Sequence, residues 1–343
     1  MLLRSASRPS RRALVTAGTC AVLAAVLTAC GSSSSTEPAA DATKAKAWSF
    51  VDDRKTTVSA PSAPERVVAF TGTAAALVDF GVDSQVVGVF GETKRKDGTP
   101  EPQAGDLDLE RVQVLGNAWG EFDLERYATL RPQLLVTHMY DPKSLWYVPE
   151  ESKDKIAKLA PTVAINVNGV PLTTPIERYA ALAESLGADL EDPKVVAAKA
   201  RFERAAENLR TIAAKQGGIT VLAGAGSPDL FYVSNPKMAS DLLYFAQLGV
   251  RFVQPTKLDE GGYFEGLSWE NAAKYDADVI LLDKRAISLQ PAALAAKPAW
   301  KQLPAVRAGQ VTGWDAVPRF SYAGAAPLLE DLAKALSTAR KVS

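Results

Sequence analysis

Residues 192–218 read DPKVVAAKARFERAAENLRTIAAKQGG and predict one long helix near the middle of the chain. Asp192 is a favourable N-cap, and Pro193 suits the first helical position. Apolar residues then recur at steps of three or four until Gly217 and Gly218 end the pattern. About 23 helical residues span roughly 34 Å, which is long enough to cross from one lobe to another. An ordinary surface helix within one domain is the alternative interpretation.

On both sides of this helix, short apolar strands alternate with helices. Before it we expect strands at 66–70, 85–90, 112–115, 133–137 and 163–167, with helices at 73–80, 123–130, 152–159 and 176–186. After it we expect strands at 219–223, 231–233, 279–282 and 311–314, with helices at 239–248, 269–274 and 325–337. This alternation predicts α/β architecture with largely parallel sheets. The expected fold is two Rossmann-like lobes, at 61–190 and 217–343, joined by the one long helix at 191–216, with a ligand cleft between them.

A short internal correspondence favours two lobes of related design. Segments 125–136 and 270–281 both begin with a glutamate at the same spacing from an apolar strand. Each glutamate follows a helix-capping residue, Asp123 or Ser268, by two positions. The pattern predicts equivalent loops of the two lobes facing one cleft. Chance similarity of two helix–strand units is the alternative.

The first thirty residues have the pattern of an export signal. A basic region with four arginines precedes an apolar stretch at 13–27, which is short and alanine-rich for a transmembrane helix. The stretch ends in Leu27-Thr28-Ala29-Cys30, which resembles the bacterial lipobox, whose cysteine is lipidated. We therefore expect a signal peptide at 1–29, then lipidated Cys30 and a flexible tether at 30–60. A signal peptide with a chance cysteine is the alternative, and the route of export, general or twin-arginine, stays open.

Composition excludes several classes of protein. The 343 residues are 47% hydrophobic, and 39 Lys+Arg balance 39 Asp+Glu, so there is no electrostatic case for a nucleic-acid partner. His138 is the only histidine, and both cysteines, Cys20 and Cys30, lie in the first thirty residues. These counts argue against multi-histidine zinc sites, bis-histidine haem, iron–sulfur clusters and disulfide frameworks.

Several of these features together resemble the helical-backbone (class III) substrate-binding lipoproteins of ABC importers. The resemblance rests on the lipobox, the two α/β lobes, the connecting helix, the segment 124–136, the opening strand at 66–70 and the segment 309–314 before the last helix. It covers roughly residues 60–340. The resemblance implies a binding protein for ferric siderophores, haem or cobalamin, and it implies little hinge motion because one long helix links the lobes.

The resemblance also implies two docking residues. In that family one surface glutamate per lobe docks onto arginines of the permease, and Glu125 and Glu270 match these positions. A carboxylate suits this role because arginine binds it bidentately. The alternative is that each glutamate only interacts favourably with the dipole of its own helix. Glu121 and Glu265 are substitutes if the register differs.

The ligand cleft should be lined by loops at the carboxyl ends of strands, and these loops are rich in aromatic residues. We expect ligand contacts from Trp119, Tyr140, Trp146, Tyr232, Tyr263 and Trp314, with Tyr147, Phe264 and Phe320 as further candidates. Core packing is the alternative for each of them. Arg95, where hydroxamate-binding relatives place an arginine, and Arg319 are expected to donate to ligand oxygens. Lys237, Lys284 and Arg285 are further basic groups, but the sequence does not show that they converge.

We therefore expect a monomeric lipoprotein at the outer face of the bacterial cytoplasmic membrane that captures a ferric siderophore and delivers it to an ABC permease. The aromatic, modestly basic loops favour a hydroxamate over a triply anionic catecholate. No resident cofactor or metal site is expected, because iron would arrive as a chelate. A cobalamin or haem receptor, bare iron held by tyrosine and carboxylate, a structural lipoprotein and an envelope enzyme are alternatives. The enzyme is disfavoured because the sequence lacks a nucleophile elbow and a phosphate loop.

Overall fold

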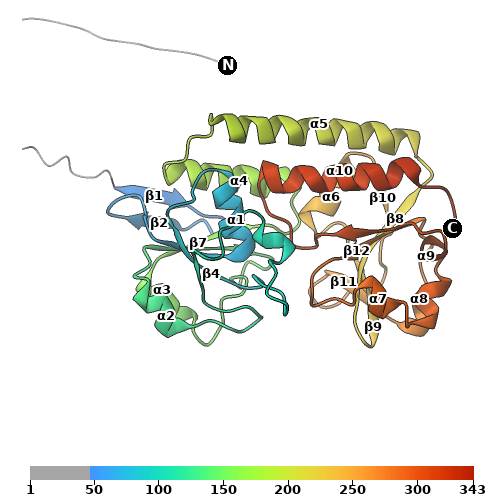
Figure 1. Ribbon diagram of the computed structural model, residues 1–343, viewed down its shortest axis with the longest axis horizontal. Helices are drawn as coiled ribbons and strands as arrows, with labels where there is room; N and C mark the ends of the chain where they lie inside the picture. Colours follow the sequence, from blue (N-terminus) through green and yellow to red (C-terminus); the bar gives the residue numbers. More distant parts are fainter. Residues whose placement is uncertain (1–46) are drawn as a thin grey trace, which may run out of the picture. The chain divides into compact units, whose positions relative to one another are not determined.

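The computed structural model describes residues 47–343 (Figure 1). The predicted signal peptide at 1–29 and Cys30 lie outside the described residues. The described residues form one compact unit with a main sheet in each lobe, as predicted, and a further two-stranded sheet near the start of the described part. Within the described part, no helix combines the length and the hydropathy needed to cross a membrane.

The sheet of the N-terminal lobe has five parallel strands in the order β5-β4-β3-β6-β7. The strands are β3 (Val67–Phe70), β4 (Val86–Phe90), β5 (Gln113–Val114), β6 (Leu134–Met139) and β7 (Thr162–Asn166). The helical elements are α1 (Thr71–Asp79), η1 (Pro102–Ala104), α2 (Leu124–Thr129), α3 (Lys153–Leu159) and α4 (Thr173–Ser185). All residues of β3 and β6 are buried, which is typical of central strands covered on both faces.

The sheet of the C-terminal lobe is mixed, with the order β11-β9-β8-β12-β13 and with β10 also paired to β8. The strands are β8 (Thr220–Gly226), β9 (Leu230–Ser234), β10 (Arg251–Phe252), β11 (Phe264–Ser268), β12 (Val279–Asp283) and β13 (Val311–Trp314). The helical elements are α6 (Ser240–Gln247), η2 (Trp269–Asn271), α7 (Pro291–Leu294), α8 (Pro298–Gln302) and α9 (Pro304–Arg307). Strand β9 runs antiparallel to both β8 and β11, so the expectation of largely parallel sheets holds fully only for the N-terminal lobe.

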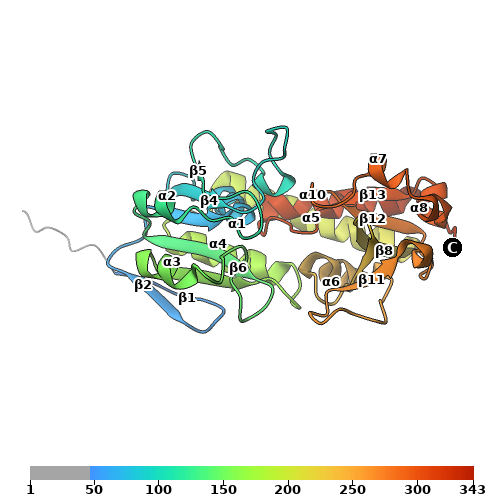
Figure 2. The ribbon, with the colours of Figure 1, turned by 90° about the horizontal axis from the view of Figure 1, so that it is seen from below.

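One long helix connects the lobes, as the sequence predicted. Helix α5 spans Pro193–Lys215, and the Asp192 side chain accepts a hydrogen bond from the Lys194 amide at 2.8 Å. It packs along the last helix, α10 (Tyr322–Thr338), and the two helices lie on the same side of both sheets (Figure 1). Seen from below, after a turn of 90° about the horizontal axis, the two lobes with their sheets follow one another along the long axis (Figure 2).

Aromatic contacts join this helix pair to both lobes. Phe202 of α5 contacts Tyr244 of α6 and Tyr322 of α10, with ring centroids 5.8 and 5.7 Å apart. Tyr322 in turn contacts Phe80, which follows α1, at 5.9 Å. One hydrophobic cluster therefore contains residues of both lobes together with α5 and α10.

The segment predicted as the end of a flexible tether contains a hairpin. Strands β1 (Trp48–Val51) and β2 (Thr57–Ala60) pair antiparallel, and Trp48, Phe50 and Val58 join the core of the N-terminal lobe. The burial of these apolar side chains overrides the polar composition of the neighbouring residues. The prediction of a flexible tether is therefore wrong for residues 48–60.

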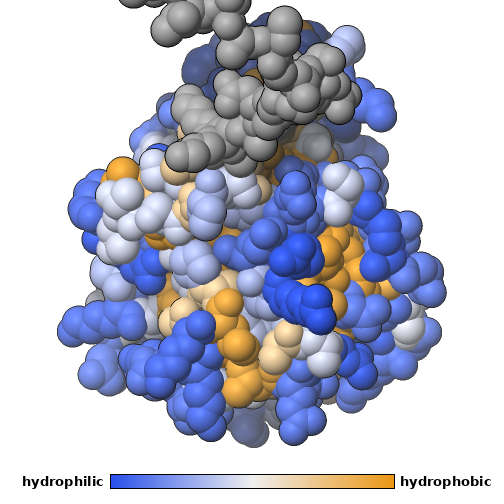
Figure 3. All heavy atoms as spheres, turned by 90° about the vertical axis from the view of Figure 1, so that its left-hand side faces the viewer, coloured by the Kyte–Doolittle hydropathy of each residue, from blue (hydrophilic) through white to orange (hydrophobic). Residues whose placement is uncertain are grey.

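The turn of the hairpin covers the edge of β7. The Asp53 amide donates to the Ala164 carbonyl at 3.1 Å, and the Asp52 carboxylate accepts from the Ala164 amide at 3.1 Å. These bonds occupy main-chain groups that an edge strand otherwise leaves free. Figure 3 shows the end of the molecule that includes this lobe, where hydrophilic side chains separate small hydrophobic patches.

Segment 269–274 is not the predicted helix. It forms the short 3-10 turn η2, whereas its counterpart in the N-terminal lobe is the α-helix α2. Trp269 explains the difference, because its indole is buried and donates to the carbonyls of Ser227 and Pro228, both at 3.2 Å. Both elements still precede a buried parallel strand, β6 or β12, as the internal correspondence predicted.

Replacing Asp52 should destabilise the protein. Its buried carboxylate accepts hydrogen bonds from Arg54 Nε at 2.7 Å and from the Ala164 amide. We expect Asp52→Ala to lower the free energy of unfolding by about 2–4 kcal/mol, measured by urea denaturation. Asp189→Asn is the control, because this exposed carboxylate bonds only the nearby Glu191 amide among the described residues. Equal effects of the two variants would contradict the role of the hairpin turn.

Candidate functional site

The carboxyl ends of strands from both lobes meet at an inner cavity of about 180 Å³. Tyr140 follows β6, Ser234 ends β9, Arg285 follows β12 and Trp314 ends β13. Because β11 is antiparallel to β9, Tyr263 at its start reaches the same place. The cavity is lined by Tyr140, Trp146, Ser234, Asn235, Met238, Ala239, Tyr263, Phe264, Arg285, Trp314, Ala316 and Val317. Open α/β sheets bind ligands at such an edge.

Aromatic rings form much of the wall. The rings of Tyr140 and Trp146 meet edge to face with centroids 4.5 Å apart. Trp314 is buried, and its Nε1 donates to the Asp241 carboxylate at 2.6 Å. Asp241 has no cation partner among the described residues, and its burial raises its pKa to about 6 despite the bond from Trp314.

Three buried polar atoms at this wall have no hydrogen-bond partner among the described residues. They are the Tyr140 hydroxyl, Trp146 Nε1 and the Ser234 hydroxyl. A buried polar group without a partner costs about 1–3 kcal/mol, so three around one cavity are a substantial cost. Each of them can donate a hydrogen bond, which matches a ligand rich in oxygen acceptors.

Arg285 is the positively charged residue of the lining, and its own loop holds it. Its Nε and Nη2 donate to the buried Asp283 carboxylate at 3.1 and 2.8 Å. The Gln290 amide braces the same loop by donating to the carbonyls of Asp283, Arg285 and Ser288. Burial disfavours the charged form, but Asp283 outweighs it and raises the pKa of Arg285, so this side chain remains cationic.

Glu92 of the N-terminal lobe faces Arg285 across the cleft. The distance from Arg285 Nη1 to Glu92 Oε2 is 3.8 Å. Burial raises the pKa of Glu92, while the charge of Arg285 opposes this shift. Two carboxyl groups, of Asp283 and Glu92, face one guanidinium. The site therefore has little excess positive charge to offer an anion.

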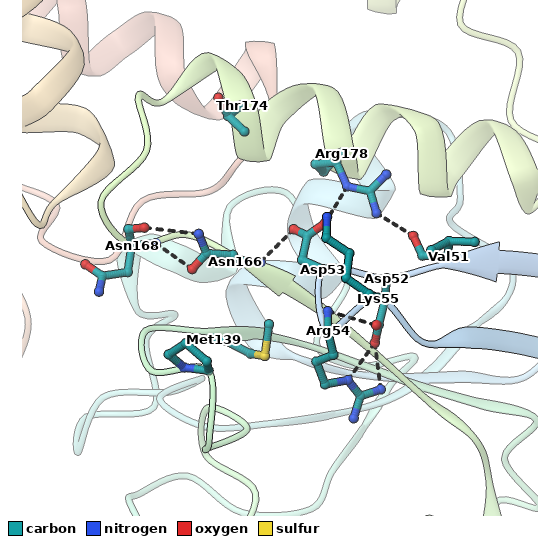
Figure 4. Close-up of a pocket in the computed structure, with 11 residues that line it drawn as sticks. Val51, Asp52, Asp53, Arg54, Lys55, Met139, Asn166, Asn168, Thr174 and Arg178 are labelled. Carbon is teal, nitrogen blue, oxygen red and sulfur yellow. Dashed lines mark hydrogen bonds and ion pairs between the residues drawn. The ribbon is translucent and has the colours of Figure 1, made fainter.

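A larger hollow of about 710 Å³ lies beside the hairpin turn (Figure 4). Four of its charged groups bind one another: Asp52 pairs with Arg54, and Asp53 pairs with Arg178 at 2.8 Å. The Asn166 side chain exchanges hydrogen bonds with the Asn168 main chain, while Asn168 Oδ1 is buried without a partner among the described residues. This hollow has one such atom and no aromatic lining, whereas the inner cavity has three such atoms and aromatic walls, so we take the inner cavity as the candidate site.

The structure brings half of the predicted ligand residues to the cavity. Tyr140, Trp146, Tyr263 and Trp314 line it. Trp119 lies outside the lining but contacts Trp146, with ring centroids 5.1 Å apart, and is 63% exposed.

The other three predicted residues have different surroundings. Arg319 donates to the Asp79 carboxylate at 3.1 Å, so it joins the C-terminal segment to α1. Its guanidinium also packs against Gly105, so closely that a Cβ on that residue would collide with it. Arg95 approaches Glu101 at 3.5 Å, and Tyr232 packs against Phe264 at 6.1 Å. None of them lines the cavity, so we correct the prediction that Arg319 and Arg95 point into it.

Arg285 was only one of five basic candidates in the sequence. Of the others, Lys284 pairs with Asp315 at 3.0 Å, and Arg95 and Arg319 are paired as described. Arg285 differs from the other basic candidates because it follows β12, an inner strand of the sheet, by two residues. Recognising β12 as an inner strand requires the strand order, which the sequence does not give.

His138 is a packing residue. It is fully buried between Phe70, Tyr140 and Phe320, and burial lowers its pKa to about 3, so the imidazole is neutral. Among the residues that the structure describes, no group of three or more His, Cys, Asp or Glu could hold a metal ion.

The predicted docking residues are both exposed, one on each lobe. Glu125 lies in the first turn of α2 and Glu270 in η2. Helix α2 and helix α8, which packs on η2, both lie on the side of the sheets opposite α5 (Figure 1). Of the substitutes, Glu265 is buried by Lys274 and Tyr275, whereas Glu121 is exposed.

Asp241 should make stability depend on pH. Its folded pKa of about 6 lies above the usual value of 3.8, so its stabilising contribution is complete below pH 3.8 and is lost as pH rises through 6. We expect the wild type to gain about 1 kcal/mol of unfolding free energy between pH 7 and pH 5 relative to Asp241→Asn. Urea denaturation at both pH values measures this. Identical pH dependence in the two proteins would contradict it.

Comparison with known proteins is consistent with this architecture. The crystal structure of DesE, a ferric-siderophore receptor protein from Streptomyces coelicolor, is 54% identical, with a TM-score of 0.83, over 86% of this chain and 100% of the DesE chain. YhfQ of Bacillus subtilis, whose name describes an ABC transporter substrate-binding lipoprotein, is 25% identical over 302 residues, 82% of this chain and 86% of YhfQ.

A more distant structure shares the fold. The FhuD protein from S. pseudintermedius is 24% identical, with a TM-score of 0.57, over 85% of this chain and 99% of the FhuD chain. Residues 67–318 match the sequence pattern of periplasmic binding proteins. The chain belongs to the periplasmic binding protein family, whose members are substrate-binding proteins of ABC importers rather than enzymes.

Proposed function

We propose that this protein binds a ferric siderophore in the inner cavity and delivers it to the permease of an ABC importer. The observation that carries the proposal is the group of three unpartnered donors, on Tyr140, Trp146 and Ser234, beside the Arg285 guanidinium. A siderophore presents oxygen atoms that accept such bonds. The similarity to DesE supports the same ligand class.

The charge of the site favours a hydroxamate chelate. Three singly charged hydroxamates neutralise Fe(III), whereas three doubly charged catecholates leave a triply anionic complex. Arg285 is already balanced by Asp283 and faces Glu92. A triply anionic ligand would meet these carboxylates without enough cations to compensate, so a neutral chelate fits better.

The size of the cavity limits how the chelate binds. Ligand pockets typically enclose about 300–1,000 Å³, and the inner cavity is smaller, at about 180 Å³. A chelate would therefore extend past Tyr140 and Trp146 toward exposed Trp119, or the lobes would separate slightly to admit it. Iron enters only as part of this chelate, with no resident cofactor.

Location and partners follow from the same proposal. We infer that Cys30 is lipidated after removal of residues 1–29, which would hold the monomeric protein at the outer face of the cytoplasmic membrane. The name of YhfQ, a lipoprotein, supports this location. Glu125 and Glu270, exposed on separate lobes, would then bind arginines of the permease.

Tryptophan fluorescence tests the ligand class directly, because Trp146 and Trp314 line the cavity. Residues 45–343 would be titrated with a ferric trihydroxamate, a ferric catecholate, ferric citrate, haem and cobalamin. We expect saturable quenching at submicromolar concentration by the trihydroxamate, corrected for inner-filter absorption.

Arg285→Gln should weaken this binding by about tenfold or more, since it removes a charge-assisted donor. Lys284→Gln is the matched control, because Lys284 is adjacent but pairs with Asp315 outside the cavity. Tighter binding of the catecholate than of the trihydroxamate would contradict the hydroxamate assignment. No saturable response to any ligand would contradict the proposed function.

The two glutamates should separate transport from binding. We expect Glu125→Ala with Glu270→Ala to leave the dissociation constant of the chelate unchanged and to abolish uptake of ⁵⁵Fe-labelled chelate by cells. Both side chains are exposed and neither lines the cavity. Glu150→Ala, which removes another exposed carboxylate of the N-terminal lobe, is the control. Normal uptake by the double variant would refute the docking assignment.

A further inference from the structure

Two kinds of contact join the lobes next to the inner cavity. Main-chain bonds form where α4 and α6 begin: the Gly169 amide donates to the Met238 carbonyl, and the Leu172 amide donates to the Ser240 carbonyl, both at 3.0 Å. Separately, the Tyr263 hydroxyl donates to the Tyr140 carbonyl of the opposite lobe. The same hydroxyl accepts from Asn168 Nδ2 at 3.2 Å. We call this second set, Tyr263 with Tyr140 and Asn168, the inter-lobe clasp.

The clasp depends on the half-buried Tyr263 side chain, whereas the other side-chain bond between the lobes here is buried with the main-chain bonds, where the Ser240 hydroxyl donates to the Val167 carbonyl. Rotation of Tyr263 about its first side-chain bond would release both contacts and leave the lobes free to separate at this point. The ring also lines the cavity, while Asn168 lines the larger hollow beside the hairpin. The clasp therefore stands between the two hollows, and its release would open the cavity on that side.

The main chain around Tyr263 is fixed while the side chain has room. The Tyr263 amide donates to the Asp259 carboxylate at 2.8 Å, and the Tyr263 carbonyl accepts from the Asn235 amide at 2.8 Å. The ring lies against exposed Gly261, where a Cβ would be 2.7 Å from Tyr263 Cδ2. Gly262 has φ of 77°, a conformation that favours glycine. The two glycines thus let the ring lie in the position that closes the clasp.

A ligand can enter the inner cavity only if a contact at its wall opens. At about 180 Å³ it is smaller than the chelate that it is proposed to hold, and contacts between the lobes limit its expansion. The other contact across the cavity joins two charged side chains, Arg285 and Glu92. Tyr263 belongs to an exposed turn and makes neutral hydrogen bonds, so its contact can open without separating an ion pair.

We propose that Tyr263 is a gating residue, whose hydroxyl holds the lobes together across the cavity and whose rotation admits and releases the ligand. This inference rests on the proposed function for the identity of the ligand, but the clasp itself is a property of the free protein. Removing the hydroxyl should speed binding and release together, because the clasp closes the cavity in both the free and the bound states.

Tyr263→Phe tests this in two ways. With a ferric trihydroxamate, stopped-flow tryptophan fluorescence should show association and dissociation rate constants that each rise about fivefold, as expected for loss of one hydrogen bond. Without ligand, spin labels on Glu125→Cys and Glu270→Cys report the distance between the lobes by double electron–electron resonance. We expect a broader distribution, shifted to longer distances, in Tyr263→Phe. Both native cysteines precede residue 45, so in residues 45–343 the spin labels attach only to the two introduced cysteines.

Two further variants make the test selective. Gly261→Ala places a methyl group against the ring and should act in the same direction while keeping the hydroxyl. Tyr244→Phe is the control, because Tyr244 stacks on Phe202 away from the cavity lining.

The possible results distinguish failure of the Tyr263 gate from failure of the proposed function. A rise in the dissociation rate constant alone would make Tyr263 an ordinary ligand contact and overturn the gate. An unchanged distance distribution would also overturn it. A changed distribution, with no binding of any chelate by the wild type, would support the clasp and reject the proposed function.

Discussion

The packing of α5 against α10 is the constraint on which the rest of the structure depends. These helices join both lobes in one hydrophobic core, which contains Phe202 and against which Tyr322 packs. Because the sheets are fixed to the same helices, the carboxyl ends of β6, β9, β12 and β13 face one cavity. The Arg319–Asp79 contact and the Tyr263–Tyr140 contact add further connections between the lobes. The lobes therefore place donors from separate parts of the chain within reach of one ligand.

The chemistry of the cavity follows from this placement. Tyr140, Trp146 and Ser234 have buried donor atoms without partners in the described part of the chain, a cost that a ligand can recover on binding. Arg285 supplies charge, but Asp283 and Glu92 balance it, and this balance is the reason for proposing a weakly charged chelate. The small volume adds a second condition, since the ligand must extend outward or the lobes must separate.

Local sequence patterns predicted the elements better than they predicted the partners of charged residues. The N-cap Asp192, the helix to Lys215 and the strand from Val311 to Trp314 depend on neighbours in sequence, and they were found as expected. Arg319 and Arg285 both follow strands in the same lobe, and only the fold shows that Asp79 pairs with one while the other reaches the cavity. The hairpin at 48–60 was missed because its stability comes from burial against the lobe, which no local pattern reports.

A crystal structure of residues 45–343 with a ferric trihydroxamate would show where the chelate binds, because anomalous scattering locates the iron. We expect one iron site at the inner cavity, with chelate oxygens within hydrogen-bond distance of Arg285 and of at least one of the Tyr140, Trp146 and Ser234 donors. Iron in the hollow beside the hairpin turn, or a chelate that leaves these donors without partners, would rule out the inner cavity as the siderophore site.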